Sequence, residues 1–219
     1  MANTDADDTA GGPYTFTLPD GSTLTSPGTY TGKASVQYTN GDSYEGEYVN
    51  GKKEGKGVYT YRNGDKFEGQ YRDNKRTGLG RIDYSEGGFY HGNFEDGKRS
   101  GEGTRRYANG DIYYGLWLNG KHNGEGTYIF NTTKYKLIGK WKDGALLEGR
   151  WVWRNGTTFE GTFTMNKPDG PGHWIFSNGT RVQGTYSQRV LPVDDAPDDD
   201  PQPAQRIDIQ WLTSGISAA

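Results

Sequence analysis

Few side chains in this chain could do chemistry, and they are widely spaced. Cysteine is absent, and the three histidines, His91, His122 and His173, lie far apart with no recurring Asp partner. Acid–base catalysis and metal binding both need such partners at short range. Gly-x-Gly pairs such as Gly55/Gly57 lack the Lys-Ser/Thr or βαβ context of a phosphate loop. The sequence therefore predicts no catalytic residue, no cofactor-binding residue and no metal ligand, so we expect a protein that is not an enzyme.

The composition indicates what kind of core the chain can form. It contains 35 Gly, 16 Tyr, 8 Phe and 6 Trp, but only 31% of its residues are hydrophobic. So few aliphatic side chains exclude a deep aliphatic core. Disordered chains are depleted in aromatic residues, so ordered β-structure built on rings is the better interpretation.

Charge and hydropathy restrict the class further. Without cysteines, an apolar leader or a long apolar run, the chain is expected to be soluble and intracellular. Residues 1–13 hold three Asp and no base, and residues 190–219 hold six Asp and one Arg, although the net charge is only −3. The body between them is therefore mildly basic. That charge is too small and too mixed to predict a nucleic-acid binder.

An internal repeat of about 23 residues organises the chain. Six full units begin at Tyr44, Phe67, Tyr90, Tyr113, Leu137 and Phe159, with one insertion before the fifth and one deletion before the sixth. These residues define repeat position 1. Partial units precede them at 14–21 and 32–41, and another follows at 182–186.

Aromatic and glycine residues alternate within each unit. Positions 1, 5, 16 and 18 are mostly aromatic and hold 21 of the 30 rings, whereas positions 3 and 14 are always Gly. Strand side chains alternate with a period of two, so the rings share one face. Each Gly is expected to leave a slot for a ring of a neighbouring strand. Burying about 150–250 Å² per ring would then replace an aliphatic core.

The turn residues complete the predicted fold. Asn-Gly recurs at positions 20–21, as in Asn63-Gly64, and is the signal for a two-residue type I′ hairpin. Positions 7–12 read as a longer connection. The prediction is an all-β fold, an elongated single-layer antiparallel β-meander of about 14 strands, with irregular termini to which any helix is confined.

Four segments follow from this organisation. Residues 1–13 are predicted to be a disordered acidic N-terminus, and residues 14–189 the repeat sheet, with full repeats at about 44–181. Residues 190–205 are an acidic Pro/Asp linker. Residues 206–219 form a C-terminal docking segment or added strand, and its apolar side chains are Ile207, Ile209, Trp211 and Leu212.

The repeat resembles a known family. The pattern YxGxWxxGKxxGxG, present here from Tyr113 to Gly126, is similar to the MORN (membrane occupation and recognition nexus) repeat. The entry segment 31–48, the insertion 135–141, the variant repeat 163–179 and the acidic, Trp-containing tail are similar to one subfamily. That subfamily is the MORN subunits of the ciliary radial spoke head, the family of radial spoke protein ten and radial spoke head protein one.

The resemblance implies a function that periodicity and charge do not. It implies a structural scaffold subunit of the radial spoke head in the axoneme of motile cilia and flagella. Such a subunit binds other spoke head proteins within a large hetero-oligomer and, through them, the central pair apparatus, which regulates dynein. The alternative is a membrane- or cytoskeleton-tethering MORN adaptor that binds anionic lipid or protein, although the chain shows no membrane anchor.

Three surfaces on the predicted sheet are candidate binding sites. A basic edge at positions 9 and 10 could be a solvated edge, an acidic-protein site or a lipid site; it comprises Lys52, Lys53, Lys75, Arg76, Lys98, Arg99 and Lys121. An aromatic groove could hold an extended peptide; it comprises Trp117, Phe130, Trp141, Trp151, Trp153, Phe163, Trp174 and Phe176.

The third surface is an apolar patch on the face opposite the rings, where repeats one to three are mostly polar. From repeat four this patch comprises Tyr114, Leu116, Leu118, Ile129, Ile138, Val152 and Ile175. Apolar residues on the wet face of a single-layer sheet indicate burial by something else. A partner interface and a cover formed by the chain's own tail are both open interpretations.

Overall fold

The computed structural model describes residues 14–191 and 206–217, which contain strands and turns but no helix. The strands are β1 (Tyr14–Thr17), β2 (Thr23–Leu24), β3 (Gly32–Tyr38), β4 (Ser43–Val49), β5 (Lys52–Thr60), β6 (Lys66–Arg72), β7 (Lys75–Asp83), β8 (Phe89–Glu95), β9 (Lys98–Arg106), β10 (Ile112–Leu118), β11 (Lys121–Ile129), β12 (Lys136–Lys142), β13 (Ala145–Val152), β14 (Thr158–Thr164), β15 (Lys167–Ile175), β16 (Arg181–Leu191) and β17 (Arg206–Ser217).

All seventeen strands belong to one open antiparallel sheet. Strand β1 pairs with both β2 and β3, and from β3 onward successive strands pair. The predicted all-β meander is therefore confirmed. The strand number exceeds the expected fourteen because three strands, β1 to β3, precede the first full repeat and the C-terminal segment adds β17.

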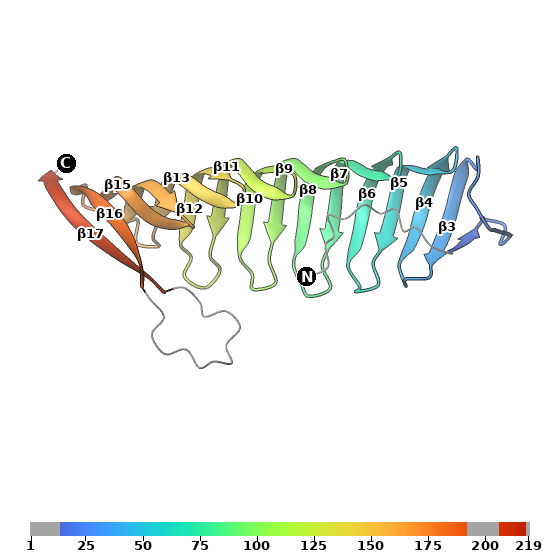
Figure 1. Cartoon of the computed structure of the whole chain (residues 1–219), viewed down its shortest axis with the longest axis horizontal. Coiled ribbons are helices and arrows are strands. Elements are labelled where there is room, and N and C mark those ends of the chain that lie inside the picture. The colour runs from blue at the N-terminus through green and yellow to red at the C-terminus, as the bar shows by residue number, and fades with distance from the viewer. Residues whose placement is uncertain (1–13, 192–205, 218–219) are drawn as a thin grey trace. The chain divides into compact units, whose positions relative to one another are not determined.

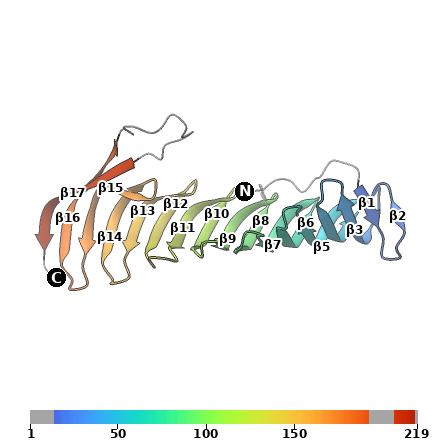
Figure 2. The same ribbon diagram turned by 90° about the horizontal axis from the view of Figure 1, so that it is seen from below.

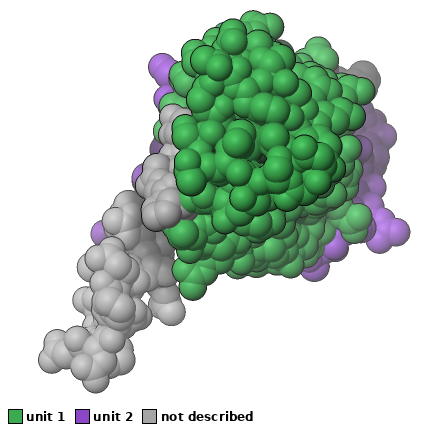
Figure 3. All heavy atoms as spheres, turned by 90° about the vertical axis from the view of Figure 1, so that its right-hand side faces the viewer, with its two compact units in different colours: residues 1–126 green, residues 127–219 purple. Residues whose placement is uncertain are grey.

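The chain divides into two compact units, residues 1–126 and residues 127–219, coloured separately in Figure 3. In unit 1, strands β3 to β9 lie side by side in chain order (Figure 1). In unit 2, strands β12 to β17 do the same (Figure 2). Strand β11 contains the boundary.

Within each repeat the two glycine positions face each other. Gly46 pairs with Gly57, and beyond this pair the register shifts, so that Tyr48 pairs with Lys53. The extra residues of β5 form a bulge around Gly55, whose φ is +67°, a conformation that only glycine adopts without strain. The bulge changes which residues of the second strand face inward.

The hairpin turns differ from the prediction. At the Asn-Gly dipeptides of positions 20–21 only the glycine has a positive φ, as at Gly64 (+88°), whereas a type I′ turn needs two such residues. Gly64 N donates to Tyr61 O and Tyr61 N to Asp65 O, so the loop has three residues, a type I turn followed by a left-handed glycine. The asparagine is explained by its side chain, because Asn63 Oδ1 accepts the N–H of Asp65 at 3.0 Å.

The type I′ turn lies instead at positions 7–8, which the sequence assigned to a longer connection. Asn50 and Gly51 have φ of +49° and +76°, and Val49 pairs directly with Lys52. This turn also joins successive repeats: Asn74 N donates to Lys53 O at 3.1 Å, and Gly97 N to Arg76 O at 3.0 Å. The turns of the second, third and fourth full repeats thus donate to the position-10 carbonyl of the preceding repeat.

Candidate partner-binding surfaces

The aromatic face forms the core of each unit. Position-1 and position-5 rings meet edge to face within a repeat, as Tyr44 and Tyr48 do at 5.4 Å and 88°. They also meet between repeats, since Tyr44 lies 5.2 Å from Tyr71 at 85°. Edge-to-face contacts of this geometry are favourable beyond the area that they bury.

The glycine pairs make room for the position-1 rings. A Cβ on Gly57 would lie 2.6 Å from Cζ of Tyr44, so this ring occupies the space that a side chain would fill. The ring comes from the facing strand for Gly57, as expected, but from the same strand for Gly46. Burial raises the pKa of the equivalent Tyr113, whose hydroxyl donates to Leu116 O at 3.0 Å.

This packing corrects the predicted aromatic groove. Trp117, Trp141, Phe163 and Trp174 are buried, so their rings hold the sheet together and present no peptide-binding surface. Phe130, Trp151 and Trp153 are half-buried, and Phe176 is exposed. The sequence could not separate these two groups, because both alternate with the same period.

The predicted basic edge is also corrected. Lys53 and Arg76, at position 10, are buried in the ring core of unit 1, and Arg99 is half-buried there. The exposed residues are those at position 9: Lys52, Lys75, Lys98 and Lys121. Successive strand residues point to opposite faces, so a row of adjacent Lys and Arg pairs cannot form one edge.

The buried cations are stabilised by rings and carbonyls. Lys53 Nζ lies 4.6 Å from the Tyr59 ring centroid and 4.9 Å from that of Tyr44. Arg76 stands over Phe67 at 5.4 Å, donates to Tyr61 Oη at 3.0 Å, and donates to a backbone oxygen, Gly97 O, at 2.7 Å. A buried cation is tolerated where ring faces and hydrogen bonds replace its hydration.

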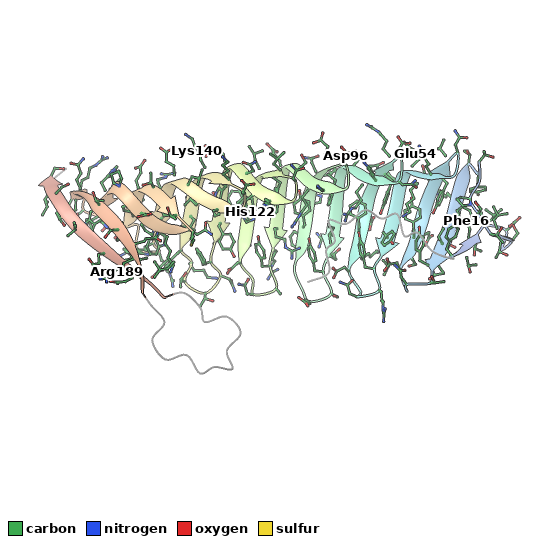
Figure 4. The ribbon with its side chains drawn as sticks, in the orientation of Figure 1. Phe16, Glu54, Asp96, His122, Lys140 and Arg189 are labelled. Carbon is green, nitrogen blue, oxygen red and sulfur yellow. The ribbon has the colours of Figure 1, made fainter. Side chains whose placement is uncertain are left out.

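His122, at the same repeat position, continues this series of buried side chains. Its imidazole stacks on Tyr113 at 3.6 Å and 11°, and its Nε2 lies 3.0 Å from Tyr107 Oη. Burial, followed by the positive charge of Arg99, lowers the pKa of His122 to about 4. The side chain is therefore neutral at pH 7. Figure 4 labels it away from the sheet edge where Glu54 and Asp96 are labelled.

The position-9 lysines form exposed ion pairs with the turns of the next repeat. Lys52 Nζ lies 2.6 Å from Asp73 Oδ1, and Lys75 Nζ lies 3.3 Å from Asp96 Oδ1. The hydrogen bond to Lys52 lowers the pKa of Asp73. Exposed pairs of this kind contribute little to stability.

The outer face of β10 carries three exposed apolar side chains. Tyr114, Leu116 and Leu118 are 47%, 38% and 49% exposed, and they alternate along one strand of unit 1. Leu116 pairs with Glu102 of β9. A run of exposed apolar residues beside charged ones is a feature of protein-binding surfaces.

The other predicted members of the apolar patch lie in unit 2. Ile129, Ile138, Val152 and Ile175 are half-buried there. Two further residues are exposed on the outer face of unit 1 and were not predicted, Val49 (44%) and Leu79 (57%). Each stands alone in a polar repeat, so no run of neighbouring residues marked it.

The C-terminal segment forms the last strand, β17, of unit 2. It pairs with β16 along its whole length, and Trp211 packs against Tyr186 at 4.8 Å and Phe159 at 6.0 Å. Ile207 and Ile209 are half-buried, and Leu212 is 68% exposed. Trp211 therefore extends the ring core and does not cover the outer face. The predicted linker lies mostly at 192–205, outside the described residues, as do residues 1–13.

An open groove of about 910 Å³ crosses the outer face of unit 1. Glu45, Glu68, Lys56 and Arg81 are among its lining residues. Its charges are mixed, and its floor is the backbone of the paired glycines. Such a surface fits no particular small molecule.

The described residues provide little for catalysis. No group of three or more His, Asp or Glu side chains within residues 14–191 and 206–217 could hold a metal ion. His173 Nε2 lies 3.5 Å from Glu160 Oε2 on an open surface. The same residues contain no helix that is long and apolar enough to cross a membrane.

Comparison with solved structures gives only distant likenesses. The TCP domain of SAS-4 (dCPAP) of Drosophila melanogaster, in complex with a proline-rich motif of Ana2 (dSTIL), is 15% identical. The match covers 80% of this chain and 86% of that one, with a TM-score of 0.29. The E1021V mutant of the TCP10 domain of Danio rerio CPAP is 14% identical. That match covers 78% of this chain and 92% of the CPAP domain, with a TM-score of 0.26. These values support no argument about function. No curated protein matches the chain.

A family model, by contrast, matches half of the chain. The MORN repeat model matches residues 44–66, 67–89, 90–112, 113–132 and 159–181. The unit at 137–158, which lacks one residue, is outside these matches but forms the hairpin of β12 and β13. MORN is a structural repeat and not an enzyme family, and it suggests a protein-interaction or scaffold role. The chain belongs to the MORN repeat family.

Proposed function

We propose that this protein is a scaffold subunit of the radial spoke head of motile cilia and flagella. In this role it binds other spoke head subunits and helps to transmit central-pair signals that regulate dynein. The proposal rests on the resemblance of residues 31–48, 135–141 and 163–179 to spoke head MORN subunits.

One structural observation supports a scaffold role in particular. The rings fill the core, whereas the outer face is open to solvent, and Tyr114, Leu116 and Leu118 are exposed on it. Apolar side chains that lose water on docking contribute free energy to a protein interface, and tyrosine is among the residues enriched at interface hot spots.

The cellular test is incorporation into axonemes. Cells that lack the endogenous protein would express a tagged chain, and salt-washed axonemes would be analysed by mass spectrometry. The wild-type chain is expected to co-purify with spoke head subunits, and the Leu116→Asp/Leu118→Asp variant is expected to be lost from them. Absence of the wild-type chain from axonemes would contradict the spoke head role.

The chain offers a matched control variant. Val49 occupies the same repeat position as Leu118 and is similarly exposed (44%), but it stands alone in a polar repeat. Val49→Asp should therefore assemble normally. If the double Leu variant assembles equally well while both proteins keep their thermal midpoints, the β10 surface is not the interface.

The alternative role, a membrane-tethering adaptor, has its own outcome. Flotation with phosphoinositide-containing vesicles would detect it. Strong flotation without axonemal enrichment would favour the adaptor role over the spoke head role.

A further inference from the structure

One cation of unit 1 differs from the other buried or half-buried cations in its surroundings. Arg105 lies on the inward face of β9, paired with Tyr90 on one side and Tyr113 on the other. Its guanidinium carbon stands 3.3 Å from the Tyr84 ring centroid and 5.2 Å from that of Tyr107. We call Tyr84, Arg99, Arg105, Tyr107 and His122 the arginine–tyrosine surface. Each of its members is only partly exposed.

The hydrogen-bonding capacity of Arg105 is unused. Its Nε and Nη1 atoms are buried and have no hydrogen-bond partner among the described residues. Its third nitrogen, Nη2, is not buried. Arg76, in contrast, donates to Tyr61 Oη and Gly97 O. On the outer face, Arg81 binds both carboxylate oxygens of Asp83.

No acid neutralises the charge of Arg105 directly. Among the described residues, Asp65 is the one carboxylate that acts on it electrostatically, as the weakest influence. The Oδ1 of Asp65 already accepts the N–H and hydroxyl of Ser85 at 2.8 and 3.0 Å. Arg99, which carries the same charge, acts more strongly than Asp65.

These surroundings favour an anionic ligand. Burial, together with Arg99, lowers the pKa of Arg105, but a guanidinium stays charged in proteins. In a partly desolvated site, a charge-assisted hydrogen bond to a carboxylate is stronger than in open water. The Tyr84 and Tyr107 rings hold the guanidinium plane in place, so little side-chain entropy remains to be lost on binding.

We propose that the arginine–tyrosine surface binds an acidic, extended segment of a partner protein, with a carboxylate of that segment on Arg105. Nε and Nη1 are buried, so the carboxylate would contact Arg105 through Nη2. The exposed lysines at position 9 lie on a different part of unit 1, where Lys52 pairs with Asp73 and Lys75 with Asp96. The site is thus distinct from both the position-9 lysines and the β10 surface.

The test uses the purified full-length chain and a fluorescein-labelled octapeptide of alternating Asp and Ala. Fluorescence anisotropy at low salt should show saturable binding. Arg105→Gln should weaken it at least about tenfold, the usual loss for one charge-assisted hydrogen bond. Arg105→Lys, which keeps the charge but not the planar fork, should retain part of the affinity.

Arg106→Gln is the matched control. Arg106 is the next residue of the same strand and is exposed on the opposite face. Its replacement by Gln removes the same positive charge as Arg105→Gln does. Its binding should stay within about twofold of the wild type, as expected for a screened surface charge. Circular dichroism and thermal midpoints would show that each variant is folded.

Three results would overturn the proposal. The first is an equal loss of peptide affinity in Arg105→Gln and Arg106→Gln, which would indicate attraction by net charge only. The second is that the acidic peptide does not bind. The third is binding to phosphatidylserine vesicles without binding to the peptide. None depends on the spoke head role, because the assay contains only the purified protein.

Discussion

The imidazole of His122 stacks face to face on the ring of Tyr113, with 3.6 Å between the centroids and 11° between the planes. Three repeats earlier, at the same position, Lys53 stands over Tyr44. Position 10 therefore supplies a cationic or imidazole side chain to the ring core in each of the first four full repeats. In unit 2 the corresponding residues are Leu146 and Pro168, both buried.

The burial of His122 predicts that stability depends on pH. Its pKa is lowered to about 4 from 6.5, so between these values the unfolded chain binds a proton that the folded chain does not. Stability should therefore fall as the pH drops from about 6.5 to 4, by roughly 3 kcal/mol at most from this residue. Urea unfolding at several pH values would measure the loss.

Carboxylates also titrate in this range, so the prediction concerns a difference between variants. His122→Gln should show a shallower loss of stability with falling pH than the wild type. His91→Gln alters an exposed residue and should leave the slope unchanged. Identical slopes for all three proteins would contradict the assignment.

The glycine slot predicts a large effect of one methyl group. Gly57→Ala would place a Cβ 2.6 Å from Cζ of Tyr44, whose ring is itself packed on both sides. We expect a loss of about 1–3 kcal/mol in the free energy of unfolding. Gly215→Ala, where the nearest atom is 3.9 Å away, should change it by less than about 0.5 kcal/mol.

The buried cations predict that size matters at position 10. Arg76→Ala removes the contacts with Phe67 and Phe94 and should cost about 3 kcal/mol. Arg76→Leu fills most of the space, as Leu146 does in unit 2, and should cost clearly less. Lys75→Ala, at the neighbouring exposed position, should cost under about 1 kcal/mol. Similar unfolding midpoints for both Arg76 variants would show that packing does not dominate.

The last type I′ turn contains a residue that its conformation disfavours. Met165 has a φ of +50° and is 65% exposed, so it gains little packing in return. Position 7 of the other full repeats holds Asn or Asp, which adopt this conformation more readily. Met165→Asn should raise the free energy of unfolding by about 0.5–1 kcal/mol. Met165→Ala keeps the disfavoured conformation and should give no gain.

Much of the fold was predictable because the same residue pattern recurs in six repeats, so a substitution in one repeat does not hide it. Alternating rings and glycines at Tyr44, Gly46 and Tyr48 fix a strand and its inner face, since the period of two is set by backbone geometry. Six copies of that pattern imply a meander in which each repeat packs on the next. The exposed run at Tyr114, Leu116 and Leu118 was visible in the same way, as a departure from the polar pattern of the outer face.

What the sequence could not determine was where the pattern is interrupted. Asn63-Gly64 and Asn50-Gly51 are the same dipeptide, yet one forms a three-residue loop and the other a type I′ turn, because strand pairing decides how many residues are left to turn. The bulge at Gly55 then decides which side chains of β5 face inward.

By itself, the sequence determined the repeat, the strands and the aromatic face. Only the tertiary structure decided that Lys53, Arg76 and His122 lie among the rings and not on a basic edge. The physical reason is that a charge is buried only where neighbouring repeats supply ring faces and carbonyls to replace water. Those groups come together only when the repeats stack.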